Sequence, residues 1–361
     1  MRVLEVDAGR EWRGGQNQVR LLCRELGRVP DLTLRLVTAR GSELARRAAA
    51  GGATVREATW GPSLDPRACA RVTAEIAAFR PDIVHAHNSH ALVVALWARA
   101  LAGLRLRAGG GRAPRLVATR RVVFSIRRRF GRSPLHRVDR VIAISEAVKA
   151  ALVADGLPLA RIAVVPDGID PDEVRRAAAA PFHLRHRLGL PPETPLAVNV
   201  AALAPEKDQH TLIRAARDAL ALRPDLHWVV VGEGELRPTL EAEIAALGVG
   251  HRVHLLGYVE QADPLIREAQ VVVMSSRQEG LGSVVLHALA LEQPVVATSG
   301  GGLPEIVPEA CVVPVGDHAA LARLVVTTLD HPAPVPLPAR FTAAAMAQGV
   351  LDVYRGLTTD D

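Results

Sequence analysis

The chain has 361 residues, 49% of them hydrophobic and 23% charged, which suits a globular protein with two domains of ordinary size. This composition excludes wholesale disorder and collagen-like repeats, and the three widely separated cysteines exclude a disulfide scaffold or a cysteine-based zinc site. The formal net charge is +6, but residues 1–175 hold thirty basic and seventeen acidic side chains, whereas residues 176–361 hold fourteen and twenty-one. The basic half predicts an anionic partner, although an arginine-rich genome would also raise the arginine count.

Along the first half, short β-branched runs alternate with longer helical stretches. The expected strands are Val3–Val6, Leu34–Val37, Ile83–Ala86, Arg115–Ala118, Arg140–Ile144 and Ile162–Val165. The expected helices are Asn17–Leu26, Glu43–Ala50, Pro66–Phe79, Ala91–Ala102 and Ser145–Ala154. Apolar strands separated by helices predict a parallel sheet that is covered on both faces.

The same alternation restarts in the second half. The expected strands are Ala197–Val200, Trp228–Val231, Val253–Leu256, Val271–Met274, Pro294–Ala297 and Cys311–Val313. The expected helices are His210–Leu222, Leu236–Leu247, Pro264–Ala269, Ser283–Leu291, His318–Leu329 and Phe341–Leu357. The fold class is therefore α/β, with two doubly wound Rossmann-like domains that face an interdomain cleft.

The domain boundaries follow from the breaks in this pattern. We expect a first domain over 1–170, a second over 171–340, and a helix over 341–361 that packs back toward the first domain. The joint lies between Gly168 and Arg185, and the four prolines of His331–Pro338 exclude a helix there. The triple glycine 109–111 predicts a flexible surface loop. No signal peptide or membrane span is expected, since Glu5 interrupts the first apolar run and the stretch from Ala91 to Leu104 is too short.

Ligands of open α/β sheets bind at the carboxyl ends of the strands, and several motifs follow expected strands of the first half. Gly14-Gly15 precedes the first helix, where it forms either an anion-binding turn or an ordinary tight turn. His85, His87 and His90 follow the strand at Ile83, but no acidic or sulfur ligand nearby completes a metal set. We therefore expect no metal, a packing role for His85 and a role in the cleft for His87.

Two further motifs follow strands of the second half. Lys207, one of two lysines in the chain, lies where the first strand ends and suits a diphosphate. The segment Ser275–Ser283 contains Glu279-Gly-Leu-Gly282 and runs into a helix, so Gly280, Leu281, Gly282, Ser283 and Val284 offer backbone N–H groups to an anion. No GxGxxG motif is present, which argues against a dinucleotide oxidoreductase.

These motifs, in this order, resemble the retaining glycosyltransferases of family 4, which have the two-domain GT-B fold. The resemblance rests on Glu206-Lys207, Val230–Glu235, Leu256–Tyr258, Glu279–Gly282 and Gln293–Ile306, and in the first half on Gly14-Gly15, His85–His87, Ala143–Ala147 and Pro166–Asp170. It implies a nucleotide-sugar donor, such as a UDP- or GDP-sugar, on the second domain and a glycan or lipid-linked acceptor on the first. It also implies transfer with retention, without a metal or cofactor, in polysaccharide or lipopolysaccharide biosynthesis.

The resemblance also implies roles for single residues. His87, Lys207 and Glu279 would be catalytic, with Lys207 on the diphosphate and Glu279 on sugar hydroxyls. The donor's nucleotide and phosphates would contact Gly14, Gly15, Gly232, Glu233, Tyr258, Gly280, Leu281, Gly282, Ser283, Val284 and His287.

The chain departs from the family pattern at two positions. Ala202 stands where the family has a phosphate-binding arginine, so Arg120, Arg121 or Arg277 would substitute. His287 stands where the family has a second glutamate on the ribose. Two alternatives to glycosyl transfer therefore stay open: a nucleotide-sugar epimerase with the same fold, and a non-catalytic relative that binds a sugar-nucleotide or a membrane.

The densest basic run is 105–140, with twelve arginines and one acid, Asp139. It predicts contact with an anionic membrane surface, and no nucleic acid partner is expected. We expect the protein in the cytoplasm, peripherally bound to the inner face of the cell membrane.

Overall fold

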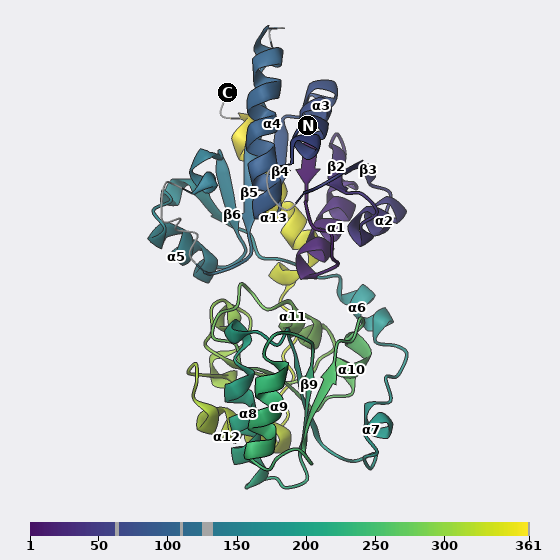
Figure 1. The fold of residues 1–361 in the computed structure, drawn as a ribbon, viewed down its shortest axis with the longest axis vertical. Coiled ribbons are helices and arrows are strands. Elements are labelled where there is room, and N and C mark those ends of the chain that lie inside the picture. Colours follow the sequence, from purple (N-terminus) through teal and green to yellow (C-terminus); the bar gives the residue numbers. More distant parts are fainter. Residues whose placement is uncertain (62–64, 109–110, 125–132, 360–361) are drawn as a thin grey trace. The chain divides into compact units, whose positions relative to one another are not determined.

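The computed structural model describes residues 1–61, 65–108, 111–124 and 133–359, and the chain forms two compact units (Figure 1). Unit 1 comprises residues 1–168 and 340–361, and unit 2 comprises residues 169–339. The C-terminal segment therefore belongs to unit 1. None of the helices in the described ranges is both long and apolar enough to cross a membrane.

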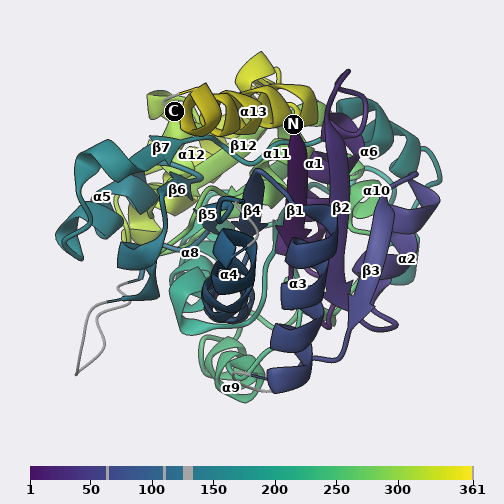
Figure 2. The same ribbon diagram turned by 90° about the horizontal axis from the view of Figure 1, so that it is seen from above.

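Unit 1 is built on a seven-stranded parallel sheet in the order β3-β2-β1-β4-β5-β6-β7, which Figure 2 shows edge on. The strands are β1 (Arg2–Val6), β2 (Thr33–Ala39), β3 (Thr54–Ala58), β4 (Ile83–Ala86), β5 (Arg115–Arg120), β6 (Arg140–Ala143) and β7 (Ile162–Val164). The register aligns Val3 of β1 with Leu34 of β2 and with Ile83 of β4. The chain reverses its direction across the sheet between β1 and β4, so the switch point lies there.

Helices cover both faces of this sheet (Figure 2). They are α1 (Gly14–Leu26), α2 (Glu43–Ala50), α3 (Pro66–Phe79), α4 (Ser89–Ala108), α5 (Glu146–Ala154) and α13 (Ala343–Thr359), with short 3-10 turns at Pro134–Arg137 and Leu159–Arg161. One face packs against α1, α2 and α13 in a single apolar core that includes Leu22, Leu36, Met346 and Tyr354. The C-terminal helix thus completes the core of unit 1.

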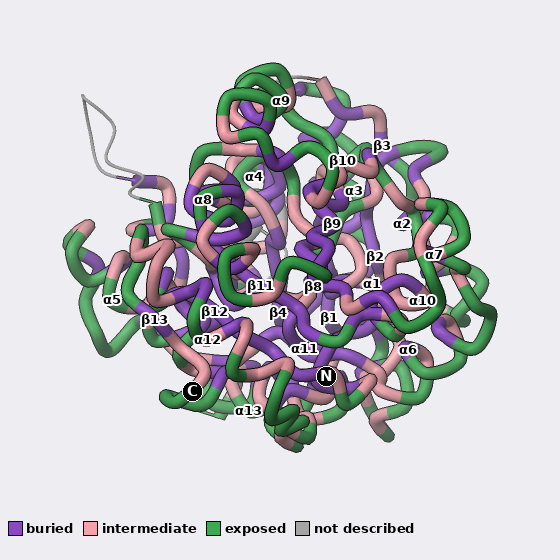
Figure 3. Tube along the Cα trace, turned by 90° about the horizontal axis from the view of Figure 1, so that it is seen from below, coloured by how far each residue is buried: buried purple, intermediate pink, exposed green. Residues whose placement is uncertain are grey.

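Unit 2 repeats the plan with six parallel strands in the order β10-β9-β8-β11-β12-β13. The strands are β8 (Leu196–Val200), β9 (His227–Val231), β10 (Val253–Gly257), β11 (Val271–Met274), β12 (Val295–Thr298) and β13 (Val312–Val313). The helices are α6 (Pro171–Ala177), α7 (Leu184–Arg187), α8 (Gln209–Leu220), α9 (Arg237–Ala246), α10 (Asp263–Arg267), α11 (Ser283–Ala290) and α12 (His318–Asp330). The 3-10 turns are η3 (Pro205–Lys207), η4 (Leu303–Glu305), η5 (Glu309–Cys311) and η6 (Ala339–Phe341), the last at the return to unit 1. Figure 3 shows buried strands and outward-facing exposed helix surfaces in this unit. Its switch point lies between β8 and β11.

Apart from helix α7, which was also missed, and helix α4, which runs to Ala108 instead of ending at Ala102, the sequence-based elements agree with the structure to within a few residues, with three further differences. The edge strand β3 was missed because its sequence, TVREA, alternates polar and apolar residues and is only half-buried. Helix α6 was missed because the region was taken for a loose joint; Asp170 caps it by accepting bonds from the Asp172 and Glu173 amides. Helix α1 begins at Gly14, so the glycine pair forms the first turn of the helix. The loop expected at 109–111 lies mostly outside the described residues.

Candidate functional site

In unit 2, two predicted residues meet at the switch point of the sheet. Lys207 follows β8 and Glu279 follows β11, and these strands are neighbours. The Lys207 Nζ lies 2.5 Å from the Glu279 Oε2, with side chains 20% and 13% exposed. The Ser276 hydroxyl lies 3.3 Å from the same carboxylate oxygen. A cation and an anion are therefore held against each other where ligands of such sheets bind.

Arg277 lies beside this pair because the loops after β8 and β11 are joined. The amides of Arg277 and Gln278 both donate to the Glu206 carbonyl, at 2.9 and 3.2 Å. The Arg277 Nε donates to Asp208 at 2.7 Å, and the arginine side chain is 60% exposed. Of the three arginines predicted to substitute at Ala202, Arg277 is the one that belongs to unit 2, and its loop is bonded to the loop of Lys207.

The glycine-rich segment after Glu279 leads directly into α11. Gly282 has a φ of +95°, a left-handed conformation that side chains disfavour, and an added Cβ would lie 2.8 Å from Leu303. No side chain caps the helix, so the amides of Ser283 and Val284 open its N-terminus toward an acceptor. Leu281 is 2% exposed, so its side chain serves packing.

Gly232, Glu233 and Tyr258 follow β9 and β10 at the same edge. The Gly232 amide donates to the Gly257 carbonyl at 2.8 Å, and a Cβ at Gly232 would lie 1.9 Å from the Ala201 carbonyl. Glu233 pairs with Arg237 at 2.8 Å, which lowers the pKa of Glu233. Tyr258 is 67% exposed. A line of predicted residues therefore extends from the switch point along this edge.

His287 has a partner that the sequence did not indicate. Its Nδ1 lies 2.6 Å from the Asp263 Oδ1, and the imidazole is 25% exposed. The contact joins α11 to the start of α10. If His287 also contacts a ribose, only its Nε2 is left to do so.

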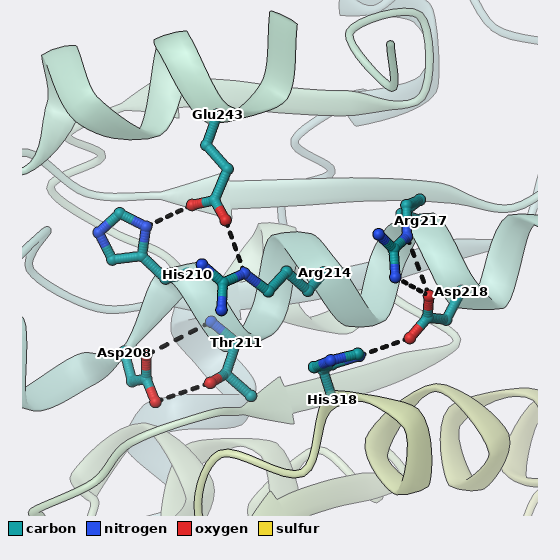
Figure 4. A network of polar contacts seen from close by, with 8 residues as sticks. All are labelled: Asp208, His210, Thr211, Arg214, Arg217, Asp218, Glu243 and His318. Atoms are coloured by element: carbon teal, nitrogen blue, oxygen red, sulfur yellow. Dashed lines mark hydrogen bonds and ion pairs between the residues drawn. The ribbon is translucent and has the colours of Figure 1, made fainter. Parts of the chain in front are cut away.

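Helix α8, which begins directly after Lys207, is fixed at both ends by ion pairs (Figure 4). In its first half, His210 and Arg214 both contact the carboxylate of Glu243 on α9. Near its C-terminus, Asp218 lies 2.5 Å from His318 of α12. These contacts make the loop that carries Lys207 part of a rigid support.

In unit 1, His87 lies just after β4, at the switch point beside β1. Its Nε2 lies 2.7 Å from the Glu5 Oε2, and both side chains are fully buried. The hydroxyl of Tyr354, from α13, donates to Glu5 at 2.9 Å and lies 2.6 Å from the Nδ1 of His85. The second nitrogen of His85 lies 2.7 Å from the Thr119 hydroxyl.

One arrangement of protons satisfies these contacts. Tyr354 has a single O–H, which goes to Glu5, so His85 must donate its Nδ1 proton to the Tyr354 oxygen. The Nε2 of His85 then accepts from Thr119, as a neutral ring requires. Burial is the main cause that lowers the pKa of His85 to about 4. The Nδ1 of His87 is the ring atom left without a partner.

Glu5 carries the negative charge of this cluster. Burial alone would raise its pKa, but the contacts with His85 and His87 together hold the pKa well below its usual range. The sequence analysis did not identify Glu5 or Tyr354 as members of a buried cluster. The signal was there for Glu5, because an acid at an inward position of a fully buried strand requires a partner.

The same cluster supplies the acid that the sequence analysis did not find near the histidines. Glu5, His85 and His87 each place one ligand atom within 4.8 Å of the others, a donor set that zinc accepts. However, the 2.7 Å between Glu5 and His87 is a hydrogen-bond distance, and the Nδ1 of His87 is the one ring nitrogen of the two histidines without a partner.

Gly15 and Arg121 lie near His87, whereas Arg120 is turned away. The guanidinium of Arg121 pairs with Asp167 at 3.2 Å and donates to the His87 carbonyl at 3.3 Å. The Arg121 Cδ is 4.0 Å from where a Cβ of Gly15 would lie. Arg120 is 8% exposed and donates to the Phe124 carbonyl.

The described arginines of 105–140 lie at more than one place on unit 1, and contact of this segment with an anionic membrane stays a prediction. Arg115 begins β5 and Arg120 ends it, so the strand separates them to opposite edges of the sheet. Residues 109–110 and 125–132, with four of the arginines, lie outside the described residues.

Two family models match the chain. Residues 183–348 match glycosyl transferases group 1, and residues 12–173 match glycosyltransferase family 4. The chain belongs to the family 4 glycosyltransferases. Its fold is accordingly GT-B, with two Rossmann-like domains.

Curated relatives match this chain over part of their length. The 2-deoxystreptamine glucosyltransferase of Streptomyces kanamyceticus is 32% identical over 56% of this chain and 54% of the relative. A GDP-mannose-dependent phosphatidylinositol monomannoside mannosyltransferase of Corynebacterium glutamicum is 35% identical over 41% of each. The chain thus spans about half the length of the curated relatives it matches. HepE of Anabaena, solved in complex with UDP-glucose, superposes with a TM-score of 0.74 at 21% identity, over 100% of this chain and 99% of that chain.

Proposed function

We propose that this protein transfers a sugar, with retention of configuration and without a metal, from a nucleotide-diphosphate sugar to a lipid-linked or cell-envelope glycan. The observation that carries the proposal is the Lys207–Glu279 pair at the switch point, beside the uncapped N-terminus of α11. A cation and free backbone N–H groups at one edge suit a diphosphate, and an adjacent carboxylate suits sugar hydroxyls.

In the proposed reaction, the bond between the anomeric carbon and the diphosphate oxygen breaks while the acceptor's hydroxyl oxygen bonds to that carbon, and the hydroxyl proton passes to the departing diphosphate. Negative charge develops on the departing diphosphate. Lys207 and the amides of Ser283 and Val284 stabilise this charge electrostatically. Arg277, at 60% exposure beside Lys207, supplies the second cation in place of the residue at Ala202.

Donor binding would also rearrange the Lys207–Glu279 pair. As the ammonium turns to the diphosphate, the Glu279 carboxylate becomes free to accept hydrogen bonds from the sugar. The pair therefore keeps both groups in place, and mutually neutralised, until the donor arrives. In unit 1, the side chain of His87 is fully buried and its Nε2 is held by Glu5, so we propose no contact between His87 and the sugar.

Relatives support the substrate classes. The names of the two curated relatives specify a glucosyltransferase and a GDP-mannose-dependent enzyme that acts on a phosphatidylinositol mannoside. We propose a UDP- or GDP-sugar as donor and an acceptor at the inner face of the cell membrane. Because the Nδ1 of His287 pairs with Asp263, only its Nε2 is left for the ribose. We therefore propose that His287 gives the ribose one hydrogen bond, where a glutamate could give two.

The test is transfer from a panel of UDP- and GDP-sugars to lipid-linked glycan acceptors, in the presence of EDTA, with the anomeric configuration of the product read by NMR. The proposal predicts the same configuration as in the donor. An inverted product would exclude retention, and loss of transfer in EDTA would exclude metal independence. Epimerised donor without transfer would identify the epimerase alternative, and donor binding without turnover the non-catalytic one.

A further inference from the structure

Helix α4 is much longer than the sheet it covers. Its twenty residues span about 30 Å at about 1.5 Å per residue, whereas the four residues of β4 span about 13 Å at about 3.3 Å per residue. The helix starts near the carboxyl end of β4 and runs back toward the amino ends of the strands. Its second half therefore extends beyond the sheet, as Figure 1 shows.

This second half exposes large apolar side chains in one stripe. Trp97, Leu101 and Leu104 are 54%, 47% and 69% exposed, and their spacing of four and three residues places them along one side of the helix. The helix contains three arginines and no acidic residue. An exposed stripe of this kind marks a contact surface more often than a free one.

A groove of about 1350 Å³ lies alongside this stripe. Trp97, Leu104 and Leu357 of α13 provide apolar lining, and its charged lining consists of Arg99, Arg112, Arg115, Arg137, Asp82 and Asp139. Asp139 lies 2.6 Å from Arg99 and 3.5 Å from Arg115. Four arginines against two aspartates leave the described lining of the groove with a net positive charge.

The same edge of the sheet carries further arginines. Arg2 and Arg140 are the first residues of β1 and β6, and Arg161 directly precedes β7. Since parallel strands all begin at one edge, these side chains share the edge with Arg115 and the groove. Arg2 and Arg161 are exposed.

We propose that this surface, formed by the stripe of α4 and the arginines at the amino edge of the sheet in unit 1, docks on an anionic lipid bilayer. Trp97, Leu101 and Leu104 enter the headgroup region, where tryptophan and leucine on one side of a basic helix favour binding. The arginines contact the anionic headgroups. We call it the amino-edge surface.

Its chemistry selects a bilayer over other anionic partners. A soluble phosphate or a nucleic acid backbone would satisfy the arginines but leave the apolar stripe in water. A bilayer satisfies both. The inference goes beyond glycosyl transfer and does not depend on it, because binding to vesicles requires no donor sugar.

Trp97 is a built-in reporter for the test. Of the four tryptophans, Trp60 and Trp228 are 3% and 1% exposed, and Trp12 is half-buried under Arg47. We would mix the full chain with phosphatidylcholine vesicles, with and without phosphatidylglycerol, and measure the tryptophan emission and its quenching by brominated lipid. The amino-edge surface predicts a blue shift and quenching with anionic vesicles, both absent in Trp97→Phe and retained in Trp12→Phe.

Two exposed leucines provide matched variants for co-sedimentation. Leu104→Ser should weaken binding by about tenfold, the effect of one lost apolar side chain, whereas Leu222→Ser in unit 2, at 56% exposure, should leave it unchanged. Arg137→Gln should weaken binding by about fivefold, the effect of one lost headgroup contact.

Several results would overturn the proposal. They are equal binding to neutral and anionic vesicles, quenching that survives in Trp97→Phe, equal losses in Leu104→Ser and Leu222→Ser, and a concentration-dependent dimer that Leu104→Ser dissociates. Full competition by soluble glycerol phosphate would show a phosphate site and not a bilayer surface.

Discussion

Replacing Glu5 by glutamine tests the buried cluster that holds His87. The substitution keeps the shape of the side chain but exchanges one acceptor oxygen for an NH2 group. That group must then face either the O–H of Tyr354 or the Nε2–H of His87, which approach Glu5 to 2.9 and 2.7 Å. At least one buried donor loses its acceptor.

The expected cost follows from these contacts. A buried group left without its partner costs about 1–3 kcal/mol, and more when the lost bond involved a charge. Glu5→Gln should therefore lower the free energy of unfolding by about 3 kcal/mol, and the unfolding midpoint of a domain of this size by roughly 6–12 °C. Tyr354→Phe removes one hydroxyl from the same cluster and should cost about 1–3 kcal/mol.

The dependence on pH gives a second measure. The folded-state pKa of Glu5 lies below its unfolded value of about 4.3, so its contribution is present above that value and is lost as the pH falls. His85, with a folded-state pKa of about 4 against about 6.5 unfolded, also destabilises the fold as the pH falls from about 6.5 to about 4. Below about pH 4.3, Glu5→Gln should make the free energy of unfolding depend less steeply on pH, because the contribution of Glu5 is gone while that of His85 remains.

The assay is urea unfolding of the native chain, the two single variants and the double variant. The pH is varied from about 3.5 to about 7, which covers most of the range in which Glu5 and His85 titrate. Because Glu5 contacts both Tyr354 and His87, the double variant should lose less free energy of unfolding than the two single variants lose together. A Glu5→Gln protein as stable as the native chain at neutral pH, with an unchanged acid transition, would refute the buried network.

Three further predictions concern unit 2. Lys207→Ala should weaken binding of the nucleotide-sugar, measured by calorimetry, by about 1.5–3 kcal/mol, because a charge-assisted contact is lost; unchanged affinity would remove Lys207 from the site. Arg277→Gln should weaken binding of the free nucleoside diphosphate, and adding Ala202→Arg to that variant should restore it. A failure to restore binding would show that the two positions do not contact the same phosphate. His287→Glu should lower the unfolding temperature, because a carboxylate would face Asp263; His287→Gln is the control, and an equal loss in both would show that charge repulsion is not the cause.

The sequence predicted most of the fold because most strands of the two sheets contain continuous apolar runs, such as Val271–Met274 and Trp228–Val231. The edge strand β3 has no such run. The residues near the carboxyl ends of β8, β9 and β11 were predictable because a parallel sheet places its functional loops at one edge.

Contacts between distant segments were not predictable. Glu5 and Tyr354 are separated by most of the chain, and no local pattern connects an acid in β1 with a tyrosine in α13. The Asp263 partner of His287 depends likewise on how α10 and α11 pack. Likewise, the density of arginines in 105–140 does not show that β5 places Arg115 and Arg120 at opposite edges of the sheet.

The measurement that tests the central claim most directly is release of nucleoside diphosphate from a panel of UDP- and GDP-sugars in the presence of acceptor. It compares the native chain with Glu279→Gln, which keeps the shape of the side chain but loses its charge. The account predicts release from at least one donor by the native chain and a rate lower by about a hundredfold in the variant, the scale of a lost stabilising contact in a transition state. Release at the same rate by both proteins, or binding of no nucleotide-sugar by the native chain, would contradict it.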